Sequence, residues 1–270
     1  MEKEIKTVQD YLMAILPYRI FECPCSCLVT KFPSLLFRGR RQSPKDSRAR
    51  LVASIGEKWH GGQPECEKKV LKNIQRKVTD SKPDMRLNDW DALALARHHG
   101  IKTRYLDWSS NCLIALWFSV SCRDGNEDKD GVESEVWVLQ TRKEDFDIPA
   151  DEIMPIPNAA NGKGSQTKLF EPTPTDRRIG AQDSYMMRQV YEPKDEKSDS
   201  KIVSVERNEL FMGRCWRVPI TDKAEIRKEL RIELEKCGYA KDTIFPKDSD
   251  FREIFSDEFV SECNNMLTQN

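Results

Sequence analysis

His98–Ser110 has the sequence HHGIKTRYLDWSS and lies between two apolar segments. The segment before it, Trp90–Arg97, predicts a helix that stops at Gly100, because glycine commonly ends helices. The segment after it, Cys112–Phe118, is almost wholly apolar and predicts a buried helix. Polar and ionisable groups held between two core elements cannot all reach bulk water, so they must pair with each other or with a ligand. This stretch therefore predicts a polar site inside an ordered core.

A second polar feature closes an apolar run upstream. Phe37, Arg38 and Gly39 follow the run from Phe32 to Leu36, which predicts a strand that ends near Arg38. The Arg38 guanidinium offers a planar fork of donors, and Gly39 lets another group approach the backbone closely. Two interpretations of Arg38 stay open: a structural ion pair that anchors a loop, or a fork that binds the phosphate or carboxylate of a ligand.

Together these stretches resemble the FRG domain, a family named for its Phe/Tyr-Arg-Gly motif. The central signature of that family is a His-aromatic/His-Gly step, then Thr-Arg-x-Leu-Asp-Trp-Thr/Ser, then an apolar run, and residues 98–118 follow it closely. Two further pieces are similar, and with them the resemblance extends from residue 30 to residue 250: Arg178-Ile179-x-x-Gln182 and Thr243-Ile244-Phe245-Pro246. The chain departs from the family pattern where Arg97 replaces a frequent Gln, Cys112 a common Pro and Ser184 the usual Gly.

The same motifs resemble, more weakly, those of mono-ADP-ribosyltransferases. In those enzymes a strand-end Arg contacts the dinucleotide phosphate, and a Ser-Thr-Ser motif, to which Ser109-Ser110 is similar, braces the nicotinamide site. A late Glu polarises the ribose, whereas this chain has Gln182 followed by Asp183. A Gln side chain cannot act as a base, so the resemblance implies weak or different chemistry, or a carboxylate supplied by Asp183. It also implies NAD as the cofactor, with transfer or hydrolysis at a glycosidic bond of NAD.

The predicted site combines ligand-binding and catalytic residues. The predicted ligand-binding residues are Arg38, Gly39, Asp107, Trp108, Ser109 and Ser110, and the predicted catalytic residues are Gln182, Asp183 and His99. His98 and His99 are adjacent, so on a helix they point about 100° apart and cannot both face one site. We expect one of them to face Asp107, either as an acid or base or as the donor of a buried hydrogen bond.

Plainer roles stay open for the same residues. Ser109 or Ser110 is placed to be the N-cap of the following helix, with Trp108 packed over the turn. Arg104 and Asp107 are three positions apart, and a salt bridge between them would shape the loop. A cap and a ligand site are compatible, because a helix N-terminus presents N–H donors that suit anions.

Composition bounds the class of protein. Lys and Arg total 44 against 45 acidic residues, so the net charge of −1 gives no overall attraction to nucleic acid or to an anionic membrane. No apolar run approaches the ~20 residues of a membrane span, and the first residues lack the apolar core of a signal peptide. Nine irregularly spaced cysteines indicate free thiols. We therefore expect a cytoplasmic protein with no membrane partner.

A metal site is not expected. Cys23, Cys25 and Cys27 alternate with other residues, and this spacing lacks both the two-residue gap and the fourth ligand of common zinc sites. No Cys or Asp stands at metal-ligand spacing around the two histidines. The interpretation of the three cysteines is an incidental cysteine-rich loop.

The order of elements predicts an α+β fold with a mixed or antiparallel sheet and flanking helices. The weaker resemblance implies that this fold is ADP-ribosyltransferase-like. We expect a helical, Cys-rich lead-in over residues 1–29, one FRG-like domain over 30–250 and a polar tail over 251–270. Within this division we expect helices at 8–15, 50–59, 65–77 and 223–236, strands at 31–38, 132–140 and 215–220, a basic loop at 40–49 and an irregular segment at 155–174.

Three functions follow as expectations. The first is a pocket for a nucleotide-like small molecule, with or without catalysis on NAD and with an unknown protein or nucleic-acid acceptor. The second is a non-catalytic binding or interaction module in a bacterial defence or stress system. The third, nucleic-acid processing, depends only on the basic segment Arg38–Arg41 with Lys45, Arg48 and Arg50, a pattern that also fits a solvated loop.

Overall fold

A six-stranded sheet forms the centre of this computed structural model, which describes residues 4–19, 32–42, 51–55, 64–122, 128–147, 167–190, 202–246, 251 and 253–268. The strand order is β4-β5-β2-β1-β3-β6, and every ladder between neighbouring strands is antiparallel. The strands are β1 (Leu35–Gln42), β2 (Tyr105–Ser109), β3 (Glu133–Gln140), β4 (Lys168–Phe170), β5 (Ser184–Arg188) and β6 (Cys215–Thr221).

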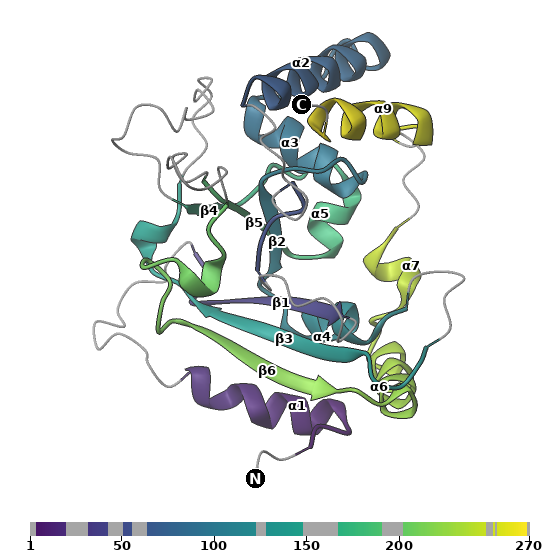
Figure 1. The fold of residues 1–270 in the computed structure, drawn as a ribbon. Coiled ribbons are helices and arrows are strands. Elements are labelled where there is room, and N and C mark those ends of the chain that lie inside the picture. Colours follow the sequence, from purple (N-terminus) through teal and green to yellow (C-terminus); the bar gives the residue numbers. More distant parts are fainter. Residues whose placement is uncertain are drawn as a thin grey trace.

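Helices flank the sheet, so the predicted α+β class is confirmed, with an antiparallel rather than a mixed sheet (Figure 1). The helices are α1 (Val8–Ile15), α2 (Pro64–Ser81), α3 (Asp89–His98), α4 (Cys112–Val120), α5 (Arg177–Ala181), α6 (Ala224–Lys236), α7 (Lys241–Ile244) and α9 (Asp257–Thr268). None of the helices in the described part of the chain combines the length and the apolar composition needed to cross a membrane.

The sheet divides between β1 and β2. These two strands share a single register pair, Phe37 with Ser109, whereas β1 and β3 are paired along their whole length, from Leu35 with Gln140 to Gln42 with Glu133. Figure 1 shows β1, β3 and β6 running together and β2, which pairs with β5, running across their direction. The sheet therefore consists of two three-stranded halves that meet at one end of β2.

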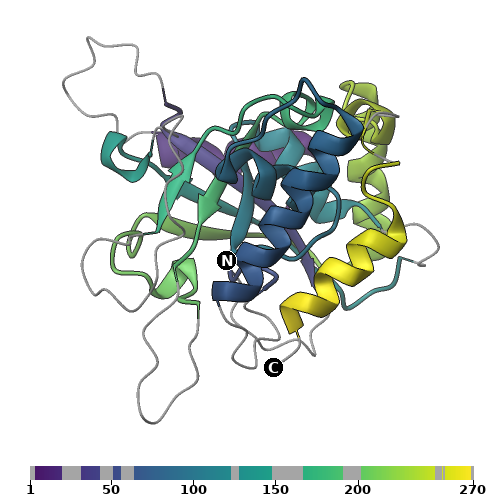
Figure 2. The same ribbon diagram turned by 90° about the horizontal axis from the view of Figure 1, so that it is seen from above.

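Each half of the sheet has its own apolar core. One core packs α1, α4 and α6 against residues such as Phe37, Val136 and Val218 of β1, β3 and β6. The other packs α2, α3 and α9 around β2 and β5, with Leu106 and Met187 at its centre. Figure 2 shows α2 and α9 side by side over this second half.

Local sequence signals explain where the central helices begin. Asn88 is the N-cap of α3, and its side chain accepts a hydrogen bond from the backbone N–H of Asp91 at 2.8 Å. Asn111 is the N-cap of α4, and its side chain accepts from the N–H groups of Leu113 and Ile114. The prediction that Ser109 or Ser110 caps this helix is therefore wrong, because the amide oxygen of Asn111 takes that position.

Several predicted elements differ from the structure. Residues 51–55, predicted to be helical, form a turn, and β1 continues to Gln42, through the start of the predicted basic loop. Residues 105–109 form β2, although the polar composition of this stretch did not predict a strand. The predicted irregular segment contains β4 at residues 168–170, and most of that segment lies outside the described residues, as do Cys23, Cys25 and Cys27.

The predicted polar tail is in fact part of the core. Phe251, Phe255, Cys263 and Leu267 are all buried in the second core. Cys263 and Leu267 lie one helical turn apart on α9, which packs against α2. Most polar residues of the same helix, which suggested a tail, are exposed, and Asn264 bonds to the backbone of Gly100 and Lys102.

Gly39 allows β1 and α4 to pack backbone against backbone. A Cβ atom added at Gly39 would lie 1.8 Å from the carbonyl oxygen of Ala115 and 2.8 Å from the backbone nitrogen of Ser119. Both atoms belong to the α4 backbone and cannot move aside as the end of a side chain can. The close approach predicted at Gly39 is therefore an approach of helix α4.

We expect Gly39→Ala to lower the free energy of unfolding by about 3 kcal/mol or more. Overpacking typically costs about 1–3 kcal/mol, and the cost here is at or above the top of that range because the added Cβ would clash with the backbone of α4. Gly180→Ala is the matched control, since an added Cβ there meets nothing within 4 Å. Urea denaturation of both variants measures the difference. Equal stabilities of the two variants would show that α4 does not pack against Gly39 as described.

Candidate functional site

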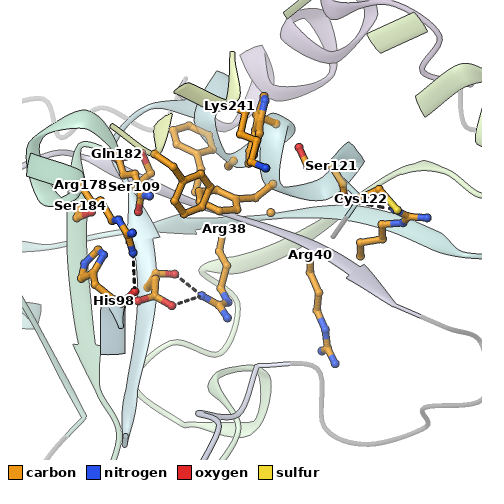
Figure 3. A pocket seen from close by; sticks show the side chains of 18 of the residues that line it. Arg38, Arg40, His98, Ser109, Ser121, Cys122, Arg178, Gln182, Ser184 and Lys241 are labelled. Carbon is orange, nitrogen blue, oxygen red and sulfur yellow. Dashed lines mark hydrogen bonds and ion pairs between the residues drawn. The ribbon is translucent and has the colours of Figure 1, made fainter. Parts of the chain in front are cut away.

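A cleft of about 1980 Å³ lies where the two halves of the sheet part. All four sequence motifs contribute to its wall although they are far apart in the chain. The contributing residues are Phe37, Arg38 and Gly39 from β1, His98 from α3, Asp107, Trp108 and Ser109 from β2, Arg178 and Gln182 from around α5, and Phe245 and Pro246 after α7. Figure 3 shows His98, Ser109, Arg178 and Gln182 gathered at one end of the cleft and Arg38 beside them. The motifs thus converge on one place.

Arg38 spans the gap between β1 and β2. Its Nη1 atom donates to the backbone oxygen of Asp107 at 2.5 Å and lies 3.6 Å from the Oδ2 atom of the same residue. Arg97, on α3, approaches Asp107 from the other side, and its Nε and Nη2 atoms both lie 2.9 Å from Oδ2. One carboxylate is therefore held between two guanidinium groups.

This arrangement sets the charges of the three side chains. Burial disfavours the charged form of Asp107, but the positive charges of Arg97 and Arg38 outweigh that effect and lower the pKa of Asp107 to about 2. Burial also lowers the pKa of Arg38, to about 10, although Asp107 opposes the fall. Asp107 and Arg38 are therefore both charged near neutral pH, and this group of two guanidinium groups and one carboxylate carries one net positive charge.

The salt bridge between Arg104 and Asp107, one of the two interpretations of Asp107, is not formed. Arg104 does not reach Asp107 but forms a buried two-point ion pair with Glu67 on α2, in which its Nε atom donates at 3.0 Å. Arg104 and Glu67 are among the most buried side chains of the protein, each about 1% exposed. Arg104 is therefore a structural residue that ties β2 to α2.

The two histidines have different surroundings. His98 lines the cleft, and burial lowers its pKa, so the ring is neutral near pH 7. His99, which we predicted as the catalytic histidine, points away: its Nε2 atom lies 2.9 Å from the carboxylate of Asp176, and its ring stacks on Phe255 of the second core. Because adjacent residues at the end of a helix point in different directions, His98 faces the cleft and His99 faces the second core.

Ser109 and Gln182 hold the cleft wall together. The Ser109 hydroxyl donates to the backbone oxygen of Gln182 at 2.8 Å and accepts from the backbone N–H of Asn111. The Gln182 side-chain amide donates to the backbone oxygen of Ile244 at 3.1 Å, which fixes α7 and the Phe245 that follows it. Both side chains line the cleft and are buried, so they act at least as positioning residues.

Ser110 and Asp183 do not line the cleft. They lie side by side where β2 ends and β5 begins, and the Ser110 N–H donates to the Asp183 backbone oxygen at 3.1 Å. Asp183 has a φ of 44° and its carboxylate accepts from the Asn111 side chain at 3.2 Å. This left-handed turn points the Asp183 side chain away from the cleft, so a catalytic carboxylate at this position is not supported by its placement.

Three half-buried aromatic rings line the cleft, and the sequence did not single them out as site residues. Trp117 and Phe118 on α4 pack against Phe245, with ring centroids 5.7 Å apart in both pairs. The Arg178 guanidinium lies 5.8 Å from the Phe245 ring and also donates to the backbone oxygen of His98. An aromatic surface flanked by guanidinium groups suits a flat ring that carries an anionic group.

Buried polar atoms without a hydrogen-bond partner concentrate around this cleft. Of ten such side-chain atoms among the described residues, six belong to residues that line it: Arg38 Nε, Arg41 Nε, His98 Nε2, Trp108 Nε1, Ser121 Oγ and Arg178 Nε. Four of these six are N–H groups that can only donate. An unpaired buried donor typically costs about 1–3 kcal/mol, and an acceptor-rich ligand in the cleft would remove this cost if these side chains turned towards it.

We expect Asp107→Asn to lower the free energy of unfolding by about 1–2 kcal/mol at pH 7. The loss is smaller than for a fully buried pair because the Asp107 side chain is 37% exposed and water screens the charges. The pKa of Asp107 is lower in the folded protein than its usual value near 3.8, so its contribution is present above pH 4 and is lost as the pH falls towards 2.

Denaturation of both proteins at several pH values tests this prediction. The stability difference should shrink below pH 4. Asp183→Asn is the control, because that carboxylate meets no arginine among its described contacts and Asn tolerates the same backbone conformation. A constant difference from pH 7 to pH 2 would contradict the ion-pair arrangement.

Comparisons with known proteins agree with the motif placement. No curated protein and no solved structure matches this chain. The family model of the FRG domain matches residues 33–129, which include β1, α2, α3, β2 and α4. The matched part supplies Arg38, His98 and Asp107 to the cleft, whereas Arg178, Gln182 and Phe245 come from beyond it. Over residues 33–129, this chain contains an FRG domain.

Proposed function

We propose that the cleft binds a nucleotide-like small molecule. Arg38 would meet a phosphate or another anionic group of the ligand, and the aromatic surface of Trp117, Phe118 and Phe245 would stack on its base. The observation that carries the proposal is the concentration of unpaired buried donors around this one cleft. Phosphate oxygens only accept hydrogen bonds, so they complement that set.

NAD fits this donor set as one ligand of the class. It has two flat rings and a pyrophosphate, and the residues that would hold it are Arg38, Arg178 and the aromatic surface. When bound, NAD supplies a glycosidic bond that can be broken. Support for NAD in particular comes from the resemblance of the motifs to those of ADP-ribosyltransferases.

Binding without catalysis has the stronger support. Among the motif residues that line the cleft, Asp107 carries the carboxylate. It is held in ion pairs with Arg38 and Arg97. Gln182 stands where a catalytic Glu would be expected, and its amide is committed to the backbone of Ile244. Neither side chain is placed as a free base, so chemistry at the glycosidic bond is the second candidate function.

We expect Arg38→Ala to weaken the binding of ADP-ribose and NAD at least tenfold, because charge-assisted hydrogen bonds contribute about 1.5–3 kcal/mol. The fold should persist, since Arg97 still holds Asp107. Calorimetric titration measures the affinities, and Arg86→Ala, which removes an exposed Arg that does not line the cleft, is the control. A wild-type protein that binds neither ligand would overturn the proposal.

Gln182→Glu separates binding from catalysis. We expect slow nicotinamide release from NAD by this variant and none by the wild type, because a carboxylate stabilises a developing oxocarbenium ion better than an amide does. Gln182→Met is the matched control: it also loses the donor to Ile244 but adds no charge. Release is followed over hours with candidate protein and nucleic-acid acceptors present.

Two outcomes would change this account. Release by the wild type that Gln182→Glu abolishes would make Gln182 itself a catalytic residue. No release from any of the three proteins, all shown to be folded and to bind NAD, would leave ligand binding as the function and exclude the catalytic candidate.

A further inference from the structure

A second basic cluster lies at the other end of the same cleft. It consists of Asp128 and the three arginines around it, Arg41 on β1 and Arg227 and Arg231 on α6, and we call it the Asp128 cluster. The guanidinium nitrogens of Arg41 and Arg227 lie 2.6 Å from Oδ1 of Asp128, and that of Arg231 lies 2.7 Å from Oδ2. Three positive charges thus surround one carboxylate.

The cluster carries more positive charge than its internal contacts use. Burial opposes the ionisation of Asp128, but its hydrogen bonds to Arg227 and Arg231 lower its pKa, so the carboxylate is charged near neutral pH. Three cations and one anion leave a net charge of two positive units. The backbone oxygens of Val120 and Ser121, at the end of α4, accept from Arg231 and Arg41 and offset only part of this charge.

A structural role explains part of the cluster. Arg227 is fully buried and all three of its nitrogen atoms are bonded, to Asp128 and to the backbone oxygens of Lys129 and Val132. It therefore anchors the segment that leads into β3. This role does not account for the Nε atom of Arg41 and the hydroxyl of Ser121, which are buried without a hydrogen-bond partner. Arg41, Ser121 and Arg231 all line the cleft, whereas Arg227 does not.

The Asp128 cluster is separate from the Arg38 end of the cleft. Arg38 and Arg41 are three positions apart on an extended strand, so their Cα atoms are roughly 10 Å apart and their side chains leave opposite faces of the sheet. Figure 3 shows Ser121 and Cys122 at the end of the cleft opposite His98 and Gln182. A single phosphate cannot meet both ends.

We propose that the Asp128 cluster, through Arg41, Arg231 and Ser121, is a second anion subsite of the cleft. This second subsite rests on the proposed function and narrows the class of ligand. The ligand is then a nucleotide that carries two separate anionic groups, such as a nucleoside bisphosphate or a dinucleotide. The cleft volume of about 1980 Å³ exceeds the ~300–1,000 Å³ typical of small-ligand sites and accommodates a ligand of that length.

The charges of the cleft favour a small ligand over a nucleic-acid strand. Its wall includes the acidic residues Glu235, Asp242 and Glu253, and the chain as a whole has a net charge of −1. A groove that follows a polyanion needs a continuous positive surface, whereas two separate basic ends with acidic residues nearby suit two separate phosphates.

Calorimetric titration with adenosine 5′-monophosphate and adenosine 3′,5′-bisphosphate tests the second subsite. The wild type should bind the bisphosphate at least tenfold more tightly than the monophosphate. Arg231→Ala should remove this difference and leave the monophosphate affinity within twofold of the wild type. The matched control, Lys228→Ala, removes an exposed charge from the same helix and should keep the difference. Ser121→Ala, a smaller change, should reduce it.

Each outcome decides between the two proposals. If the wild type binds both nucleotides equally, or if Arg231→Ala keeps the difference, the second subsite is overturned while the proposed function stands. If the wild type binds neither nucleotide, nor NAD or ADP-ribose, both are overturned. If a single-stranded oligonucleotide binds more tightly than the bisphosphate, the cleft serves a nucleic acid and the small-ligand assignment is overturned. Thermal melting of each variant verifies that it is folded.

Discussion

The bridge from Arg38 to Asp107 is the interaction on which the site depends. Strands β1 and β2 share one register pair, whereas β2 and β5 share five, so the main-chain ladder nearly stops between the two halves of the sheet. Beyond that pair, the Arg38 guanidinium connects the strands: it donates to the backbone oxygen of Asp107 on β2 and lies close to the Asp107 carboxylate. A charge-assisted hydrogen bond contributes about 1.5–3 kcal/mol, more than a neutral ladder bond, so one side chain can offset the lost pairing. It does so while keeping the gap between the strands open.

Packing around this gap decides which groups line the cleft. Because Gly39 has no side chain, α4 lies directly on β1, and this contact brings Trp117 and Phe118 to the cleft and the end of α4 to Arg41. The Gln182 side chain attaches α7 and thereby places Phe245 opposite those rings. Gly39 and Gln182 therefore position the neighbouring helices as well as lining the cleft.

The same contacts separate binding from chemistry. Many charged side chains line the cleft, but the carboxylates of Asp107 and Asp128 each form ion pairs with at least two arginines. A carboxylate fixed in this way stays ionised and stabilises its neighbours, but it is a poor proton acceptor. What the cleft retains in excess are N–H donors and positive charge, which recognise an anion without reacting with it. This balance is the reason that ligand binding has stronger support than catalysis.

Local signals in the sequence were sufficient for the fold class and for the positions of several elements. The apolar run of α4 and the β-branched alternation of β3 predicted a helix and a strand where the structure has them. The resemblance to the FRG family implied that Arg38 and Asp107 belong to one site, and both line the cleft. Strand β2 was missed because its five residues mix polar and apolar side chains, and only pairing with β5 on one side makes them a strand.

Tertiary structure alone decided which charges meet. Arg104 pairs with Glu67, 37 positions away, and His99 with Asp176, 77 positions away, whereas the nearer candidate Asp107 pairs with Arg97 and Arg38. The sequence determined that these groups are buried and therefore need partners, because they lie between apolar elements. It could not determine the partners, because an ion pair depends on distance in space, and the chain brings residues from α2, α3, β1 and β2 together only when the two halves of the sheet pack.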